Sequence, residues 1–477
     1  MRCVMLRKVF AVIAFLTMIG VPSARCVLAE TPQTLTPQDA QEIAFDATVY
    51  GFPLVIMDLT RQVFTAVSAP ESLGAPANQF GNKRVFPDAS FTTVVRPNAD
   101  TLYSSAWIDT SPEPIVLSLP DTQSRYYLMP MLNMWTDAFA SPGSRTTGCS
   151  AGEYAITGPS WSGALPVGLT EVGSSTRFVW IVGRFACAGP SDYESVWSIQ
   201  DLLELTPLSA WGTADYQPPA EVPVDPEVDT TAAPLAQLLA MSAAEYLGEV
   251  CRLMVDNPPY PADGPLLAKL AELGIEAGAD YSSHFAGLDD VFRSAIEAGY
   301  RSALASLPTQ SIGTIKNGWW LPYGTGSYGT DYMLRAATAY QGLGANLVAD
   351  AFYPTALTDE SGDKLSSDRP YVLHFSKDEI PPVDGFWSLS MYNDRIMFVD
   401  NRIGRYCLGS LSDPPLVRNP DGSLDIYLQR DPPAVELLSN WLPTPQSGGF
   451  QVTLRLYWPR QPVLDRTWVP PALRAVP

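Results

Sequence analysis

Proline is the residue that most restricts how this chain can fold, because 44 of its 477 residues are prolines. Proline lacks a backbone N–H, so it is excluded from helix interiors and central strands and collects in turns, loops and sheet edges. The chain also contains 12 tryptophans and 21 tyrosines, and these residue types favour strands. Together these frequencies predict a β-rich protein with many turns, and the length suggests two or three domains.

Short apolar runs between turn residues indicate where the strands lie. Such runs recur over residues 86–188 and again from residue 353 onward, at spacings typical of a sandwich or barrel. Residues 37–68, 235–306 and 331–347 instead carry apolar side chains at helical intervals. We therefore expect an α+β, β-rich fold, with two β-sandwich or jelly-roll-like domains and helical segments between them.

These patterns divide the chain into five parts, and a stretch rich in proline and acid predicts a linker near the middle. The expected parts are a signal peptide at 1–29, an N-terminal helix and β-sandwich-like domain at 30–216, a linker at 217–234, a helical segment at 235–310, and a C-terminal β-sandwich-like domain with an initial helix at 311–477.

The two β-rich stretches share an order of features. A strand, a proline break and an aromatic run over residues 115–135 recur over residues 371–392. We therefore infer that one β unit has been duplicated, an inference that different strand orders in the two halves would contradict. A local expectation concerns Asp421-Gly422, which suits a hairpin turn between residues 416–417 and 424–428.

The first 29 residues have the features of a secretory signal. Arg2, Arg7 and Lys8 precede an apolar run over residues 9–21, which is shorter than the ~20 residues that span a bilayer. Small or modest side chains before Glu30 suit cleavage there. We expect a periplasmic or secreted protein with no membrane span in the mature chain.

Acidic side chains outnumber basic ones by 50 to 30, which gives a formal net charge of −20. Removal of residues 1–29 takes away four basic side chains and no acid, so the charge falls to −24. A protein of this charge is repelled by phosphate backbones and anionic membranes. We therefore expect a small-molecule ligand or substrate and no nucleic-acid partner, and leave a homo-oligomer open.

Few residues suit metal or nucleotide chemistry. His284 and His374 are the two histidines, whereas a His-based zinc site needs three or four ligands. The segment Gly324–Gly329 fits G-x-G-x-x-G, but Pro322 stands where a dinucleotide fold needs a buried strand. We expect no metal and no cofactor, and we interpret the glycines as a turn into a helix.

Four cysteines follow residue 29, and export would permit disulfides between them. The pair that we expect is Cys149 with Cys187, because both lie in the first β-rich stretch. Cys251 lies in a helical stretch and suits a buried thiol.

The segment Arg96-Pro97-Asn98-Ala99-Asp100-Thr101-Leu102-Tyr103 is the most unusual polar stretch. As a turn, Asn98 and Asp100 would bond their own backbone beside Pro97. As a pocket wall, Asn98, Asp100 and Tyr103 would converge on a ligand. Arginines beside aromatic residues recur elsewhere, and they suit either stacking at a sheet or a cavity for a largely apolar ligand with one polar end.

The motifs in both halves resemble two paired families. In the N-terminal half, the segment above, Arg125-Tyr126-Tyr127, Arg145-Thr146-Thr147-Gly148 and Val182-Gly183-Arg184 resemble the family called domain of unknown function 1254. The C-terminal half resembles its usual companion, domain of unknown function 1214, at Tyr328-Gly329-Thr330-Asp331-Tyr332, Arg335-Ala336, Pro381-Pro382, Phe386-Trp387-Ser388, Met391-Tyr392, Asp421-Gly422-Ser423 and Asn440-Trp441-Leu442-Pro443. The resemblance implies β-sandwich-like domains, often exported, and brings no settled activity or catalytic residue.

The matched positions with pocket chemistry are the candidate site residues. Asp100, as acid or base, and Tyr103, as proton donor, are the catalytic candidates. The ligand-binding candidates are Asn98, Arg145, Asp331, Arg335, Trp387 and Tyr392.

Three functions remain open. The first is binding of a small, partly apolar ligand between the two β-rich domains, which requires a cavity near Trp387 and Tyr392. The second is a cofactor-free hydrolase or lyase acting on such a molecule, with Arg145 or Arg335 as an anion clamp. The third is a structural or interaction protein of the cell envelope. Abundant aromatic residues and arginines without metal ligands favour the first.

Overall fold

The computed structural model of the protein describes residues 35–91, 95–213 and 216–476. The segment Pro37–Pro477 forms one compact unit. The predicted signal peptide at 1–29 lies outside the described residues.

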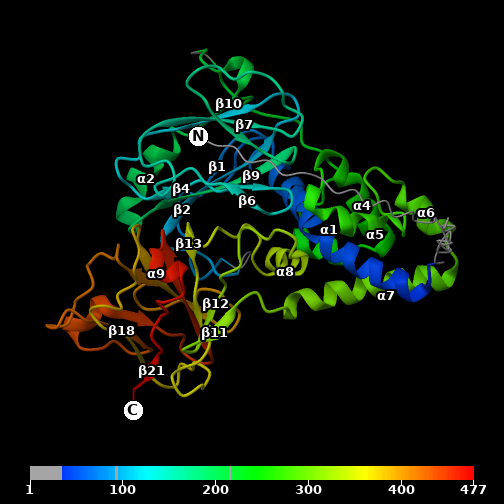
Figure 1. Cartoon of the computed structure of the whole chain (residues 1–477). Coiled ribbons are helices and arrows are strands. Elements are labelled where there is room, and N and C mark those ends of the chain that lie inside the picture. The colour runs from blue at the N-terminus through cyan, green and yellow to red at the C-terminus, as the bar shows by residue number, and fades with distance from the viewer. Residues whose placement is uncertain (1–34, 92–94, 214–215, 477) are drawn as a thin grey trace, which may run out of the picture. The chain divides into compact units, whose positions relative to one another are not determined.

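Two sheets pack face to face in the N-terminal half (Figure 1). The larger sheet has the strand order β1-β2-β9-β5-β6, with β4 beside β9, and the smaller has the order β10-β3-β7-β8. Ile108 and Val179 of the larger sheet share one buried core with Leu117 and Ile156 of the smaller, so this half is a sandwich. The strands are β1 Gly81–Asn82, β2 Thr101–Asp109, β3 Ile115–Leu119, β4 Tyr127–Leu128, β5 Met131–Asn133, β6 Ala138–Ala140, β7 Gly152–Thr157, β8 Thr170–Gly173, β9 Phe178–Ala186 and β10 Glu204–Pro207.

The C-terminal half is a second sandwich. Its larger sheet has the order β11-β12-β14-β20-β16-β17, with β13 beside β20, and its smaller sheet has the order β19-β18-β15-β21. Leu389 and Leu454 of the larger sheet share a core with Leu373 and Ile426 of the smaller. The strands are β11 Thr314–Lys316, β12 Trp319–Leu321, β13 Ala351–Phe352, β14 Thr355–Ala356, β15 Tyr371–Phe375, β16 Trp387–Asn393, β17 Cys407–Gly409, β18 Leu424–Gln429, β19 Trp441–Pro443, β20 Phe450–Tyr457 and β21 Arg474–Ala475.

The strand order of the two halves is the same except for β11, an additional edge strand of the C-terminal half. The larger sheets match as β1-β2-β9-β5-β6 and β12-β14-β20-β16-β17, and the smaller sheets match as β10-β3-β7-β8 and β21-β15-β18-β19. The strand directions also match. The pairs β7 with β8 and β18 with β19 are parallel, whereas β3 with β7 and β15 with β18 are antiparallel. The inference of an internal duplication is therefore confirmed at the level of topology.

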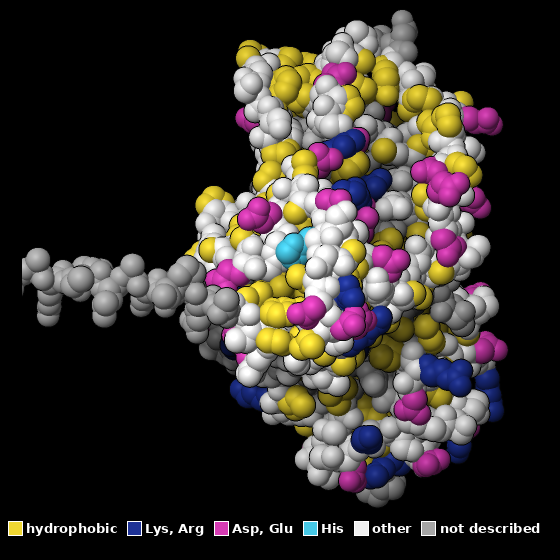
Figure 2. All heavy atoms as spheres, turned by 90° about the vertical axis from the view of Figure 1, so that its right-hand side faces the viewer, with side chains coloured by type: hydrophobic (Ala, Val, Ile, Leu, Met, Phe, Trp, Pro, Cys, Tyr) yellow, Lys and Arg dark blue, Asp and Glu magenta, His cyan; other side chains and the backbone are white. Residues whose placement is uncertain are grey.

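The helices are α1 Pro37–Thr65, α2 Tyr193–Gln200, α3 Pro234–Ala240, α4 Ala243–Asp256, α5 Gly264–Ala271, α6 Tyr281–Gly287, α7 Asp290–Ser306, α8 Tyr332–Gly342 and α9 Gln461–Leu464, with 3₁₀ turns at Pro190–Asp192, Leu208–Ala210, Pro261–Asp263, Leu307–Thr309 and Val435–Asn440. Helix α1 precedes the first sandwich, α3 to α7 lie between the two sandwiches, and α2, α8 and α9 connect strands within them (Figure 1). On the helical side, acidic side chains are scattered among basic and apolar ones (Figure 2).

Helix α1 is apolar and fully buried over its middle, residues 47–57, and carries charged side chains toward both ends. By length and composition it could cross a membrane, but 89% of its most apolar window is buried inside the fold. Helices α3, α4, α5, α7 and α8 all contact it. A helix whose apolar middle is covered on every side belongs to a protein core, so α1 is the central helix of the helical segment.

The predicted α+β, β-rich fold is confirmed, and two local predictions are wrong. The four cysteines within the described chain are free thiols: Cys149 Sγ lies 3.4 Å from Ser144 Oγ, and Cys187 Sγ donates to the carbonyl of Gly189 at 3.5 Å. The expected hairpin at Asp421 is absent because β18 pairs with β15 and β19 instead of with the residues before the turn.

Candidate functional site

The two sandwiches meet through the outer faces of their larger sheets. Side chains on a strand alternate between faces, so Phe185 of β9 enters the N-terminal core while Arg184 points away from it. In β20, Leu456 enters the C-terminal core while Arg455 and Tyr457 point away. The outward-pointing side chains of the two halves hydrogen-bond with one another, so polar groups fill the space between the sheets.

Asp100 is the centre of this polar layer. Its side chain is 5% exposed, Tyr457 Oη donates to Oδ1 at 2.9 Å, and Ser388 Oγ donates to Oδ2. Both donors come from the C-terminal half, although Asp100 comes from the N-terminal half. Because both carboxylate oxygens already accept hydrogen bonds, Asp100 is arranged as a fixed counter-charge rather than as a free proton acceptor.

Asn98 combines the two interpretations of its segment. Its Oδ1 accepts from the backbone N–H groups of Asp100 at 2.7 Å and Thr101 at 3.0 Å, which is an Asx turn. Its Nδ2 donates to the hydroxyls of Tyr457 at 3.0 Å and Tyr103 at 3.3 Å. The turn thus holds Asn98, Asp100 and Tyr103 in one group.

Two buried arginines complete the group. Arg184 is 7% exposed and Arg455 is 6% exposed. The guanidinium of Arg184 lies 5.0 Å from the ring centroid of Tyr103, and that of Arg455 lies 5.2 Å from the ring centroid of Tyr353. Arg455 also donates to Tyr392 Oη at 2.8 Å. We call the following residues the polar cluster: Asn98, Asp100, Tyr103, Arg184, Asn346, Tyr353, Ser388, Tyr392, Arg455 and Tyr457.

The two arginines occupy equivalent positions of the duplicated unit. Asn133 of β5 faces Val179 of β9, and Asn393 of β16 faces Phe450 of β20. Each asparagine closes the same turn, since its Oδ1 accepts from the backbone N–H groups two and four residues later. Arg184 lies five residues after Val179, as Arg455 lies five after Phe450, so the cluster contains one arginine from each repeat.

Other equivalent residues meet across the same interface. Tyr126 accepts a backbone hydrogen bond from Ala186, and Phe386 accepts the matching bond from Tyr457, each at 2.9 Å. The Tyr126 and Phe386 rings contact each other edge to face, with centroids 5.5 Å apart. The interface therefore resembles the isologous contact of a two-fold dimer, but within one chain.

Burial keeps three tyrosines of the cluster, Tyr353, Tyr392 and Tyr457, neutral. Desolvation raises the pKa of Tyr353 and of Tyr392, and it raises the pKa of Tyr457 well above its ordinary value, with the Asp100 charge adding to the effect. Burial by itself lowers the pKa of Arg455, but the oxygens of Tyr392, Tyr457 and Asp100 offset burial and leave the pKa well above its ordinary value. At neutral pH the tyrosines are hydroxyl donors and the arginine is a cation.

A groove of about 840 Å³ opens beside the cluster, between the two halves. Residues from both halves line it, including the equivalent pair Tyr126 and Phe386. The Phe386 ring stacks on that of Tyr457 at 4.2 Å between centroids, so one layer of aromatic rings separates the groove from Asp100. We call this hollow the groove.

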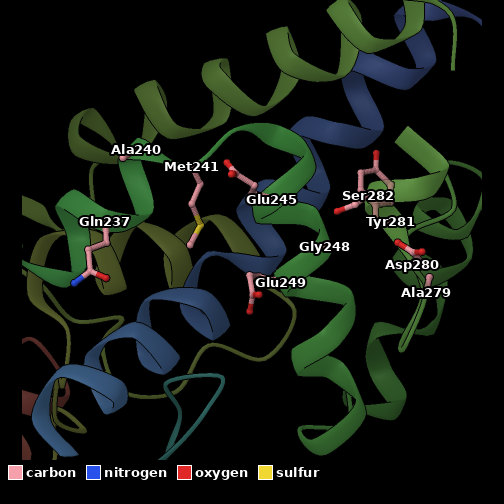
Figure 3. Close-up of a pocket in the computed structure, with 10 residues that line it drawn as sticks. All are labelled: Gln237, Ala240, Met241, Glu245, Gly248, Glu249, Ala279, Asp280, Tyr281 and Ser282. Atoms are coloured by element: carbon pink, nitrogen blue, oxygen red, sulfur yellow. The ribbon is translucent and has the colours of Figure 1, made fainter. Parts of the chain in front are cut away.

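Two other hollows lie on the helical segment and have acidic or charged walls. The larger, about 580 Å³, is lined by residues of α3, α4 and α6 (Figure 3). Its carboxylates have structural tasks: Glu245 and Ser242 form the capping box of α4, Glu249 pairs with Arg252 at 2.6 Å, and Asp280 caps α6. Among these three hollows of the described chain, none is lined by Trp387 or Tyr392.

The structure brings together only some of the candidate residues. Asn98, Asp100, Tyr103 and Tyr392 lie in the polar cluster. Trp387 lies on the opposite face of β16 and packs in the C-terminal core, 5.8 Å from the Phe375 ring. Arg145 pairs with Asp350 at 2.6 Å at the junction of the halves, and exposed Asp331 caps α8 by accepting from the N–H of Leu334 at 3.0 Å.

Arg335 lies in a separate buried group at the junction with the helices. It is 1% exposed, donates to the carbonyl of Gly329 at 2.6 Å and lies 3.5 Å from Asp137 Oδ2. Burial raises the pKa of Asp137, although the Arg335 charge opposes the rise. Asp263, which is fully buried, accepts from Tyr50 and Tyr332. Asp137 and Asp263 both accept hydrogen bonds from tyrosines there, although among the described residues Nε and Nη1 of Arg335 are buried without a partner. Because two carboxylates accompany one arginine, this group suits a structural role.

Sequence reasoning missed six members of the cluster: Arg184, Asn346, Tyr353, Ser388, Arg455 and Tyr457. The signal for Arg455 and Tyr457 was their alternation with buried leucines on one strand, which places both on the non-core face. Ser388 was not a candidate because the aromatic residue before it, Trp387, was chosen from the same motif. The partnership with Asp100 had no signal in one sequence.

Comparison with known proteins agrees with the two-part architecture. Residues 77–207 match the family model "Protein of unknown function (DUF1254)", and residues 350–461 match "Protein of unknown function (DUF1214)". No curated protein matches the chain. A crystal structure of a protein from Vibrio parahaemolyticus is similar, with a TM-score of 0.67 at 21% identity over 92% of this chain and 100% of that one. A protein from Burkholderia cenocepacia gives a TM-score of 0.43 at 14% identity over 92% of this chain and 94% of that one.

The matched ranges coincide with the larger part of each sandwich, from β1 to β10 and from β13 into α9. The Vibrio structure supports the same fold over nearly the whole chain. The chain therefore carries a DUF1254 domain in its N-terminal half and a DUF1214 domain in its C-terminal half.

Proposed function

We propose that the protein binds a small, partly apolar molecule in the groove between its two sandwiches. The observation that carries this proposal is that both halves contribute aromatic walls to one hollow of about 840 Å³. That volume falls within the roughly 300–1,000 Å³ typical of small-molecule sites. The site differs from the one expected near Trp387, which packs in the core.

The walls of the groove define the chemistry of the ligand. Its apolar side is formed by Ile199, Leu202, Phe386, Leu411 and Trp458, which suits a ring or a short hydrocarbon body. Its polar side holds the Arg125–Asp192 ion pair, with nitrogen–oxygen distances of 2.6 and 2.7 Å. An ion pair at the edge of an apolar surface can orient one polar end of a bound molecule.

The experiment is a fluorescence titration of the full chain with 8-anilinonaphthalene-1-sulfonate, an aromatic probe with one polar end. Leu202 is 60% exposed and Leu411 is 38% exposed, so replacing both with Glu spares the core. We expect saturable single-site binding that this double variant loses and that Val167→Glu, at a fully exposed position away from the groove, retains. Equal binding by all three proteins would refute the groove as the site.

We also propose that the chain is exported, on the basis of the n-region and apolar run of residues 1–29. The test is N-terminal sequencing of the protein recovered from the periplasmic or culture fraction of a bacterial host. A mature chain beginning at Glu30 is the expected product. An intact Met1 in the cytoplasmic fraction alone would contradict export.

A further inference from the structure

The charges of the polar cluster do not balance. Arg184 and Arg455 bring two buried cations, and Asp100 is the one acidic member of the cluster as defined above. The next carboxylate along the interface, Asp350, is already paired with Arg145 at 2.6 Å. Within the described residues the cluster thus holds one more positive than negative charge.

A third arginine adds to the excess. Arg96 is half-buried at the edge of the cluster, where its backbone carbonyl accepts from Arg455 at 3.0 Å. Burial lowers the pKa of Arg96, and the Arg455 charge lowers it further against the opposing effect of Tyr392. Isolated buried charge is costly, and buried cations are normally paired with anions.

The arginines also carry unused donors. Among the described residues, the Nε–H groups of Arg96, Arg184 and Arg455 are buried and have no hydrogen-bond partner. The guanidiniums of Arg184 and Arg455 are connected through a short path: Arg184 donates to Asn346 at 2.7 Å, Asn346 donates to Tyr353 at 2.9 Å, and Arg455 lies over the Tyr353 ring. Unpaired donors on excess cations define a place that favours a negative acceptor.

We infer that the polar cluster binds one small oxyanion of the carboxylate class, with Arg184 and Arg455 as its cationic partners. An oxyanion supplies the missing negative charge and acceptors for planar guanidinium N–H groups, which match carboxylate geometry. The duplication explains why two equivalent arginines face one site. The inference stands apart from the groove, because the aromatic layer of Phe386 and Tyr457 separates the two places.

The experiment follows thermal unfolding of the full chain while sodium acetate replaces sodium gluconate at constant ionic strength. Gluconate is a bulkier carboxylate of the same charge, so general salt effects cancel. We expect the midpoint to rise saturably with acetate, as mass action requires for a ligand of the folded state. Arg455→Met should raise the half-saturating acetate concentration at least about tenfold. Arg430→Met, at an exposed position, should not change that concentration.

A second measurement is needed in two cases: if the site keeps its anion through purification, so that added acetate has no effect, or if a variant fails to fold. The protein is exchanged into anion-poor buffer and denatured, and released small anions are counted by ion chromatography. About one oxyanion per chain, lost in Arg184→Met, supports the inference. No released anion together with no acetate effect, or an acetate effect that persists in both methionine variants, overturns it. The double glutamate variant of the groove should keep the acetate effect, so the two proposals fail separately.

Discussion

At the scale of single residues, strand alternation decides which side chains form the candidate site. Trp387 and Ser388 are neighbours in sequence, yet one packs in the C-terminal core and the other donates to Asp100. In the same way Leu456 is a core residue between Arg455 and Tyr457 of the cluster. The chemistry of the interface therefore depends on every second residue of two strands.

The counter-charge role of Asp100 predicts the effect of its removal. Asp100→Asn keeps the shape of the side chain but removes the negative charge that interacts with buried Arg455. Because removal of one charge from a buried ionic group is strongly destabilising, we expect a loss of about 3 kcal/mol in the free energy of unfolding. Urea denaturation measures it, with the exposed Asp431→Asn as control. A loss below about 0.5 kcal/mol would contradict the role.

The raised pKa of Asp137 predicts a pH dependence. The folded protein binds the Asp137 proton more tightly than the unfolded chain does, because burial disfavours the carboxylate. The contribution of this group to stability therefore falls as pH rises from about 4 through its raised pKa. We expect the stability difference between wild type and Asp137→Asn to shift toward the variant between about pH 4 and 7. Urea titrations at several pH values test this, and a pH-independent difference would exclude it.

At the scale of elements, glycines allow helix α1 to be covered closely. A Cβ on Gly299 of α7 would lie 2.2 Å from the carbonyl oxygen of Gln41 in α1, and one on Gly51 of α1 would lie 2.3 Å from Val250 in α4. Such distances are shorter than real Cβ contacts, so the neighbouring helices would have to move apart. Close backbone approach is what lets the apolar middle of α1 be buried by so many neighbours.

A pair of alanine substitutions tests this packing. Gly299→Ala should cost about 1–3 kcal/mol of stability through overpacking against α1, although alanine is the better helix former. Gly248→Ala in α4, where the new Cβ lies at an ordinary 3.5 Å from Ser282, should gain about 0.5–1 kcal/mol. Thermal and urea unfolding compare the two variants. Equal gains in both would show that α1 and α7 are not in close contact.

At the scale of the whole molecule, the two repeats are joined by a buried interface rather than tethered. Tyr457 and Ser388 bond Asp100, and Tyr392 donates to the carbonyl of Pro97 at 2.8 Å. Apolar contacts between Ala186 and Phe386 lie beside these bonds. Separation of the halves would expose Asp100 and both arginines, so neither half is complete alone.

This interface predicts cooperative unfolding. We expect far-UV circular dichroism, which follows the helices, and tryptophan fluorescence, which follows the sandwiches, to give coincident urea transitions. Independent domains would instead show separate midpoints. Asp100→Asn should divide the fluorescence transition into two steps, because both sandwiches contain tryptophans and the substitution weakens the contact that couples the halves. Two well-resolved transitions in the wild type would contradict the interface described here.

Local structure was predictable from the amino-acid sequence. Alternating apolar runs located the strands, helical spacing located α4, α7 and α8, and repeated motifs indicated both the duplication and the two matched families. Local turn chemistry was predictable for the same reason: the Asx turn at Asn98 is made by residues two and three positions away. These features depend on neighbours in the chain, which a sequence displays directly.

The candidate site, in contrast, depends on contacts between residues that are far apart in the chain. The bonds of Asp100 to Ser388 and Tyr457 join residues 288 and 357 positions apart, and no periodicity carries information over such separations. The same holds for Cys149 and Cys187, which share a sandwich but face different partners. The pairing of the polar faces of the two repeats depends on the packing of complete sheets. The groove and the excess of buried arginine therefore form only when both halves are folded together.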